Sequence, residues 1–275
     1  MKSCTQRYYA PLFFLVALMF VVSVSFLIGK GDGPAFERVY IAERAIVETD
    51  VGGRYHIDVQ YPELRGWRDR EAQKKVNSIV LASVLEELDA FRSAVLESDS
   101  SVARSRESAL VVTYAIEQMP TITVDSQARE GGAPVPLLSI RFVHSPYYAG
   151  AAHPDGHASG VTFRLDTGEQ VRLENFFVSP EAALSHLAGR AVEELRKQLA
   201  PFTGGSDRRF GDQISRGTTP TKDHYKHFVM GENGLVLIFN PYQVAPYVFG
   251  ILDVKVSWGE LAEILRPEWR FLARD

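Results

Sequence analysis

Short segments of alternating hydrophobic and polar residues recur along the chain after residue 38. Residues 39–49 and 55–61 are rich in β-branched and aromatic side chains, and Val51-Gly52-Gly53 between them suits a tight turn, which predicts a β-hairpin. A second hairpin is predicted around Asp166-Thr167-Gly168, whose glycine suits a left-handed backbone position. The other predicted strands cover residues 109–117, 121–126, 137–144, 160–165, 169–173, 228–239 with a turn at 231–234, and 250–256.

Two longer segments have the three- and four-residue spacing of amphipathic helices. The first covers residues 69–96, with Lys74, Lys75, Glu86, Glu87 and Arg92 expected on its polar faces. Its expected apolar stripe is Ala72, Val76, Ile79, Leu81, Leu85, Leu88 and Val95.

The second helix is predicted to begin at Ser179-Pro180-Glu181, where serine can cap, proline presets the first turn and glutamate complements the helix dipole. Pro201 and then Gly204-Gly205 are expected to end it. Residues 204–223 have no sustained periodicity and predict a long mobile loop, and a short helix is expected at residues 257–265. The apolar stripe of the second helix is Leu184, Leu187, Ala188, Ala191, Val192, Leu195 and Leu199.

Strands clustered around two main helices predict an α+β fold with antiparallel sheets. We expect an N-terminal subdomain over residues 39–150 and a C-terminal one over residues 151–275. The pattern does not define the order of the strands.

An almost unbroken apolar run at residues 12–28 has close to the length needed to cross a bilayer. Lys2 and Arg7 precede it, so we expect residues 1–11 in the cytoplasm, a single transmembrane signal anchor at residues 12–29, a linker at 30–38, and the remainder in the periplasm or extracellular space. Gly33-Pro-Ala35 is a poor cleavage site set far downstream, which favours an uncleaved anchor. Cleavage remains the alternative.

Composition describes an ordinary globular domain behind this anchor. The chain has 45% hydrophobic residues and a formal net charge of −4, so it lacks the basic surface that nucleic-acid binding requires. Its one cysteine, Cys4, precedes the apolar run, so the exported part can form no internal disulfide. The oligomeric state is not indicated.

Two glycine- and aromatic-rich blocks carry a family resemblance. Tyr147-Tyr-Ala-Gly-Ala-Ala-His153 leads into the second hairpin, and Tyr242-Gln-Val-Ala-Pro-Tyr-Val-Phe-Gly250 lies between the last strands. Together with Leu173-Glu-Asn-Phe-Phe177, they resemble the RsiV-like extracytoplasmic domain, which also accompanies PdaC-type peptidoglycan deacetylases. RsiV is a membrane-bound anti-sigma factor that binds lysozyme.

The resemblance implies a binding or sensing module of the cell envelope that recognises a lysozyme-like protein or a peptidoglycan-related ligand. Residues 1–11 are too short to fold around a sigma factor, and no paired-aspartate deacetylase motif is present, so neither activity is expected. We expect no cofactor. The candidate contact residues, which lie in blocks with glycine and proline, are Tyr147, Tyr148, His153, Tyr242, Tyr247 and Phe249.

The alternative function is a cell-wall hydrolase or deacetylase-like enzyme that uses the segment His153-Pro-Asp155-Gly-His157, because this segment holds residue types that act as metal ligands. Pro154 and Gly156 exclude a helix that would stack the histidines, and His144 or Asp166 could complete a site only through folding. A backbone-bonded loop is therefore the preferred interpretation, and no enzymatic activity is expected. Gly156-His-Ala-Ser159-Gly160 departs by one position from the spacing of a nucleophile elbow.

Overall fold

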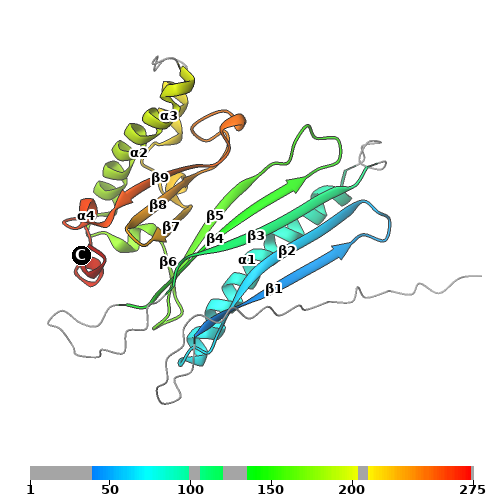
Figure 1. The fold of residues 1–275 in the computed structure, drawn as a ribbon, viewed down its shortest axis with the longest axis horizontal. Coiled ribbons are helices and arrows are strands. Elements are labelled where there is room, and N and C mark those ends of the chain that lie inside the picture. The colour runs from blue at the N-terminus through cyan, green and yellow to red at the C-terminus, as the bar shows by residue number, and fades with distance from the viewer. Residues whose placement is uncertain (1–38, 99–105, 120–134, 204–209, 274–275) are drawn as a thin grey trace, which may run out of the picture.

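The computed structural model describes residues 39–98, 106–119, 135–203 and 210–273. Two sheets and two long helices form the α+β fold (Figure 1). The larger sheet has six strands in sequential order, and the smaller has three. The six strands are β1 (Tyr40–Thr49), β2 (Tyr55–Arg65), β3 (Ser108–Gln118), β4 (Leu137–Tyr147), β5 (His157–Arg164) and β6 (Gln170–Val171), and the three are β7 (Phe228–Gly231), β8 (Gly234–Phe239) and β9 (Leu252–Ser257).

The predicted hairpins are confirmed, but the expectation of purely antiparallel sheets is wrong at one pair. Strands β2 and β3 are parallel, with Tyr55 opposite Ser108 and Val59 opposite Val112. The reason is α1 (Arg70–Leu96), which lies between them in sequence and returns the chain to its starting direction, as parallel neighbours require. The predicted strand at residues 121–126 falls outside the described residues.

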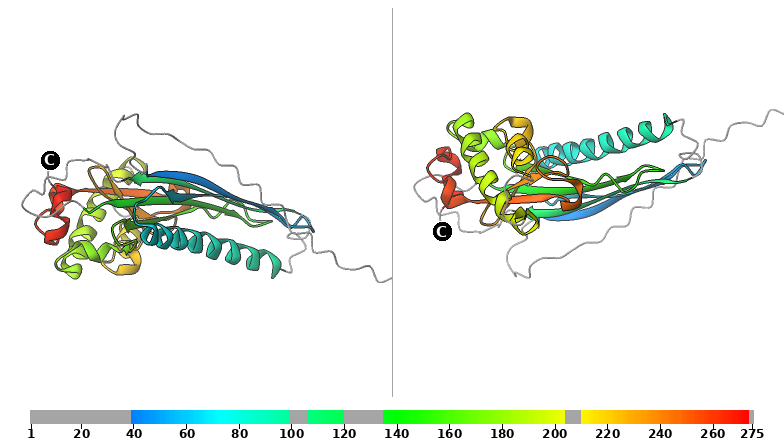
Figure 2. Two further views of the ribbon diagram at one scale, coloured as in Figure 1. Left: turned by 90° about the horizontal axis from the view of Figure 1, so that it is seen from below. Right: turned by 90° about the horizontal axis from the view of Figure 1, so that it is seen from above.

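Helix α1 runs along one face of the large sheet (Figures 1 and 2). Its start is set by Asp69, whose carboxylate accepts hydrogen bonds from the backbone N–H groups of Glu71 and Ala72. The expected stripe is partly wrong, because Leu81 and Leu85 are exposed. The buried stripe repeats every four residues, apart from one three-residue step after Leu88, and consists of Ala72, Val76, Val80, Val84, Leu88, Phe91 and Val95.

Helix α2 (Pro180–Thr203) packs on β9 with the predicted apolar stripe. The helix continues past Pro201, which lies inside its last turn, to Thr203, the residue before the predicted Gly204-Gly205. A proline at this position cannot donate the helical hydrogen bond to the carbonyl four residues earlier.

Parts of the C-terminal half are more ordered than the sequence predicts. The expected loop at residues 204–223 contains α3 (Gly211–Gly217), and η2 (Lys222–Tyr225) begins after residues 218–221. The predicted strand at 169–173 is reduced to β6 and continues as η1 (Leu173–Phe176). The expected terminal helix is α4 (Trp258–Leu261), which is capped by Ser257, with η3 (Tyr247–Phe249) before it and η4 (Pro267–Ala273) after it.

The two sheets are joined at β5. Side chains alternate along this strand, so His157 and Ser159 lie on the α1 side while Ala158 and Gly160 face β7. An ion pair also crosses the junction, because both terminal nitrogens of Arg141 on β4 bond the carboxylate of Asp253 on β9, at 2.6 and 2.8 Å. The expected boundary at residue 150 falls within the large sheet, which β5 and β6 complete.

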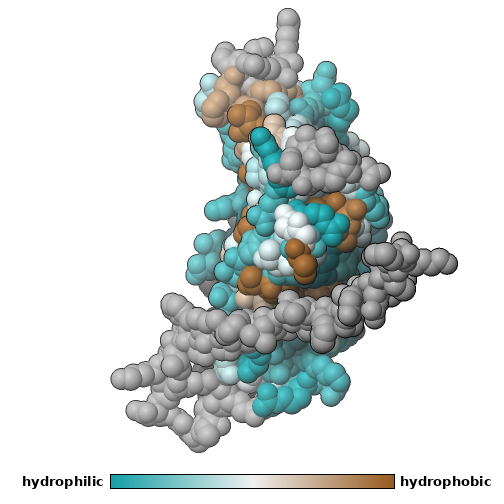
Figure 3. Space-filling view, turned by 90° about the vertical axis from the view of Figure 1, so that its right-hand side faces the viewer, coloured by the Kyte–Doolittle hydropathy of each residue, from teal (hydrophilic) through white to brown (hydrophobic). Residues whose placement is uncertain are grey.

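None of the helices in the described ranges combines the length and apolar character needed to cross a bilayer. The predicted anchor at residues 12–29 lies outside those ranges. On the face of the molecule shown in Figure 3, hydrophobic side chains form separate patches among hydrophilic ones.

Candidate functional site

Three of the predicted contact residues meet at the surface, and we call His153, Tyr247 and Tyr242 the aromatic stack. The rings of His153 and Tyr247 are stacked with centroids 3.7 Å apart and an angle of 18° between their planes. Tyr242 adds a tilted ring 5.8 Å from Tyr247. The two sequence blocks that carry the family resemblance therefore form one surface.

Hydrogen bonds hold the stack in place. The hydroxyl of Tyr247 donates to the backbone carbonyl of Pro154 at 2.6 Å. Tyr242 has a left-handed backbone with φ of 68°, which is uncommon for a tyrosine, and Gln213 of α3 donates to its carbonyl. Its side chain is nevertheless 58% exposed, and Val248, which follows Tyr247 in the chain, is 82% exposed. Backbone strain at an exposed aromatic residue is a feature found at functional sites.

The other three predicted contact residues have different neighbours. Tyr148 packs against Phe91 of α1, with ring centroids 5.5 Å apart. Phe249 packs edge-on against Phe202 and Phe210. Tyr147 is half-buried at the end of β4, opposite Ala109 of β3.

A second cluster, which the sequence did not predict as a set, consists of Glu87, His144 and His157. Glu87 was expected on a polar face of its helix, but its side chain is three-quarters buried against the sheet. One of its carboxylate oxygens, Oε2, lies 3.9 Å from Nδ1 of His144 and 3.8 Å from Nε2 of His157. The two imidazoles stack with centroids 4.6 Å apart and planes within 6°. We call these three residues the histidine–glutamate cluster.

The environment of the cluster separates the charge states of its members. Burial lowers the pKa of His144 to about 4, so this ring is neutral at pH 7. The neighbouring Glu87 carboxylate raises the pKa of His157, and His157 in turn lowers the pKa of Glu87. Of the candidate metal ligands His153, Asp155 and His157, only His157 belongs to the cluster. Within the described ranges, the histidine–glutamate cluster is the one group of three such side chains placed closely enough to hold a metal ion.

A nearby histidine gives the protein a pH dependence. Burial lowers the pKa of His227 to about 4, so its protonation in the unfolded chain draws the equilibrium toward unfolding as the pH falls from about 6.5 to 4. We expect the free energy of unfolding to fall about 2 kcal/mol further in the wild type than in His227→Gln across that window, after allowing for partial exposure. Urea unfolding at several pH values measures this. Equal losses in both proteins would contradict the buried neutral state of His227.

Asn240 fixes β5 between His157 and Ser159. Its side-chain oxygen accepts from the N–H of Ala158 at 2.7 Å, and its amide nitrogen donates to the carbonyl of the same residue at 2.9 Å. Asn240→Ala leaves both backbone groups without these partners, so we expect a loss of about 2 to 3 kcal/mol in unfolding free energy. Asn240→Asp keeps only the acceptor oxygen, so its unfolding free energy, measured by chemical denaturation, should lie between those of the wild type and Asn240→Ala. A loss below about 0.5 kcal/mol for Asn240→Ala would show that water replaces both bonds.

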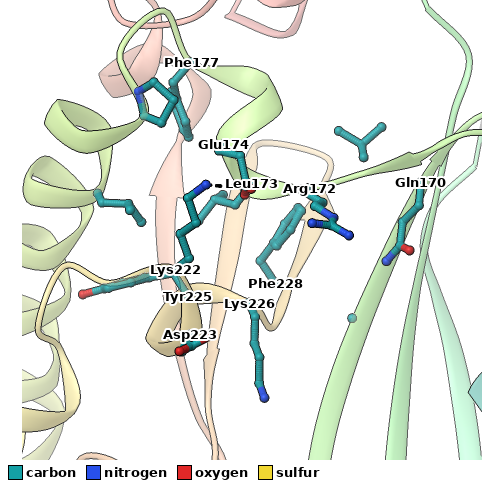
Figure 4. A pocket seen from close by; sticks show the side chains of 14 residues that line it. Gln170, Arg172, Leu173, Glu174, Phe177, Lys222, Asp223, Tyr225, Lys226 and Phe228 are labelled. Atoms are coloured by element: carbon teal, nitrogen blue, oxygen red, sulfur yellow. Dashed lines mark hydrogen bonds and ion pairs between the residues drawn. The ribbon is translucent and has the colours of Figure 1, made fainter. Parts of the chain in front are cut away.

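A pocket of about 330 Å³ lies elsewhere, where β6 and η1 face η2 (Figure 4). Arg172, Lys222 and Lys226 line it together with Glu174 and Asp223, and Lys222 lies 3.4 Å from Glu174. Its charges are thus largely balanced. None of the aromatic stack lines this pocket.

Comparison with known proteins finds similarity to one protein family and to one curated relative. Residues 174–259 match the family model described as a protein of unknown function, DUF3298. The peptidoglycan-N-acetylmuramic acid deacetylase PdaC of Bacillus subtilis is 27% identical over 135 residues, which cover 48% of this chain and 27% of the deacetylase. The match therefore spans about a quarter of that relative's length.

Two solved structures share the fold. A DUF3298 family protein from Bacteroides fragilis superposes with a TM-score of 0.55 at 15% identity, covering 84% of this chain and 95% of its own. One from Pseudomonas aeruginosa gives a TM-score of 0.53 at 13% identity, covering 86% and 97%. The shared fold thus extends well beyond the residues that match the family model. The predicted resemblance is confirmed at this level: residues 174–259 match the DUF3298 model, and PdaC is a distant relative.

Proposed function

We propose that this chain is an extracytoplasmic module of the cell envelope that binds a peptidoglycan-related ligand through the aromatic stack. The observation that carries the proposal is the convergence of His153, Tyr247 and Tyr242 from two distant loops into one stacked surface. Flat aromatic faces can contact a sugar ring or a protein at low entropic cost, because each side chain has few rotatable bonds. Relationship to a peptidoglycan deacetylase supports a location at the cell wall.

A lysozyme-like protein is the second candidate ligand. Val248, which follows Tyr247 in the chain and is 82% exposed, adds apolar surface next to the stack that a protein partner would cover. Membrane anchoring through residues 12–29 is part of the same proposal, with the described domain on the outer side of the cytoplasmic membrane.

Binding is favoured over catalysis by the partners of the two loop histidines. His153 stacks on Tyr247, whereas His157 stacks on His144 beneath α1, so the two rings are engaged by different neighbours. A hydrolase would instead need them to face one substrate. His144 lies between Ser159 and Glu87, as the histidine of a catalytic triad lies between its serine and its carboxylate, with 3.0 Å between Ser159 Oγ and His144 Nε2. The 3.9 Å between His144 Nδ1 and Glu87 Oε2 is, however, too long for the hydrogen bond that orients the histidine of a triad.

Calorimetric titration of the 275-residue chain with soluble muropeptides, and separately with lysozyme, tests this function. We expect saturable binding of at least one of them, weakened tenfold or more by Tyr247→Ala. Tyr40→Ala is the matched control, because Tyr40 is an exposed tyrosine on β1 and should leave binding unchanged. Tyr247→Phe keeps the ring and loses only the bond to Pro154, so it should bind more tightly than Tyr247→Ala. Release of wall fragments by the wild type would favour the hydrolase instead.

A further inference from the structure

The strongest unassigned feature of the molecule is the convergence of three metal-ligand atoms in the histidine–glutamate cluster. Oε2 of Glu87, Nδ1 of His144 and Nε2 of His157 all lie within 4.8 Å of one another. They come from three elements, α1, β4 and β5, and His144 is directly opposite His157 in the register of the sheet. The backbone therefore fixes the relative positions of the two histidines before any ligand arrives.

In each imidazole, the nitrogen that points away from Glu87 already contacts a protein oxygen. Nδ1 of His157 lies 3.3 Å from the carbonyl oxygen of Asp155, which can only accept, so this nitrogen carries the proton. Nε2 of His144 lies 3.0 Å from Oγ of Ser159. Metal-binding histidines show this arrangement, in which one nitrogen donates to a protein oxygen and the other directs its lone pair to the ion.

The remaining nitrogen of His144 lacks a partner. Its side chain is only 9% exposed, and its Nδ1 atom makes no hydrogen bond within the described part of the chain. Glu87 has no lysine or arginine within ion-pair distance among the described residues. Buried polar atoms are nearly always satisfied, and a cation between the unpartnered Nδ1 of His144 and the three-quarters-buried carboxylate of Glu87 would satisfy both groups.

We propose that Glu87, His144 and His157 bind a divalent transition-metal ion of the zinc class. Two imidazoles and one carboxylate are a ligand set that zinc uses, with a fourth position left for water or a ligand. Ligand atoms around tetrahedral zinc are about 3.3 Å apart, so binding would draw each histidine nitrogen about 0.5 Å closer to Glu87 and tilt the two rings out of their parallel stack. The ion would tie helix α1 to β4 and β5.

The histidine–glutamate cluster is also connected to the aromatic stack through the backbone of residues 154 and 155. The carbonyl of Asp155 holds His157, and the carbonyl of the preceding Pro154 holds Tyr247. A metal that fixes His157 therefore fixes one end of the short segment that carries His153. This inference goes beyond the proposed function and does not depend on it.

Metal binding by the 275-residue chain is the test, with Zn²⁺ measured by calorimetry and Co²⁺ by its ligand-field absorption. We expect one Zn²⁺ per chain, a Co²⁺ spectrum of a four-coordinate site with nitrogen and oxygen ligands, and a rise in Tm when Zn²⁺ is added. Glu87→Gln and His144→Gln should each weaken Zn²⁺ binding at least tenfold, and Ser159→Ala should weaken it to a smaller extent.

His227→Gln is the matched control, because it removes another half-buried histidine that lies outside the set, and it should bind Zn²⁺ as the wild type does. Circular dichroism of each variant separates lost ligands from lost folding, and Glu87→Gln is the informative substitution if His144→Gln fails to fold. Wild-type protein without stoichiometric Zn²⁺ binding, or Glu87→Gln with undiminished binding, would overturn the proposal.

Discussion

Gly160→Ala is expected to lower the free energy of unfolding by about 3 kcal/mol or more, one of the two largest losses we predict. A Cβ atom at this position would lie 1.9 Å from the carbonyl oxygen of Phe228 and 2.9 Å from a methyl carbon of Val229. The obstacle is backbone, so no side-chain rotation relieves it, and β5 and β7 would have to separate. Because this contact joins the two sheets, urea denaturation should show a lower midpoint.

Gly189→Ala is the matched control for that experiment. Gly189 lies inside α2, and a Cβ atom there would meet no atom within 4 Å. Alanine is favoured over glycine in a helix interior by about 0.5 to 1 kcal/mol, so this variant should be slightly more stable than the wild type. A Gly160→Ala protein as stable as the wild type would show that the close approach of β5 to β7 is wrong.

Phe176→Ala is expected to cost about 3 to 5 kcal/mol, because it empties the centre of the C-terminal core. Phe176 ends η1, has no exposed surface, and its ring lies 4.9 Å from that of Trp269 and 6.1 Å from that of Phe228. The cavity is walled by large rings that are themselves packed, so it cannot collapse fully. The denaturation midpoint measures the loss, provided the slope with urea concentration stays constant.

Phe202→Ala provides the comparison, since Phe202 is 59% exposed at the end of α2 and contacts Phe249 only edge-on. Its loss should stay within about 1 kcal/mol. If Phe176→Ala cost no more than Phe202→Ala, η1 would not be part of the core, and the position of the pocket beside it would be wrong as well.

Local sequence signals predicted most of the elements because each has its own physical marker. Asp69 caps α1 where a helical pattern begins, and Gly168 takes the positive φ that its turn requires. Ser257 and Glu260 form a reciprocal cap at the start of α4. Such markers act over a few residues and need no knowledge of the rest of the fold.

Features that depend on tertiary pairing could not be predicted in the same way. The parallel pairing of β2 with β3 follows from which strands meet after α1 crosses the sheet, and no residue in either strand marks it. Helix α3 is only seven residues long and begins without a side-chain cap, so its pattern resembles a loop.

The candidate site was predicted only in part for the same reason. His153, Tyr242 and Tyr247 were selected because aromatic residues lie beside glycine and proline in the loop blocks, and the structure brings their three rings together. Glu87 was missed, although it lies seven residues after Val80 and four before Phe91, which is the spacing of the buried stripe. A carboxylate at such a position is the signal that could have joined α1 to His144 and His157.

Hydrogen exchange of the chain with and without a bound wall fragment or lysozyme tests the central claim most directly, because it maps the contact surface along the backbone. We predict that added ligand slows exchange at residues 150–157 and 242–250, the two segments that form the aromatic stack. Protection confined to the pocket around Arg172 and Lys222, with residues 242–250 unchanged, would contradict the claim that the aromatic stack binds the ligand.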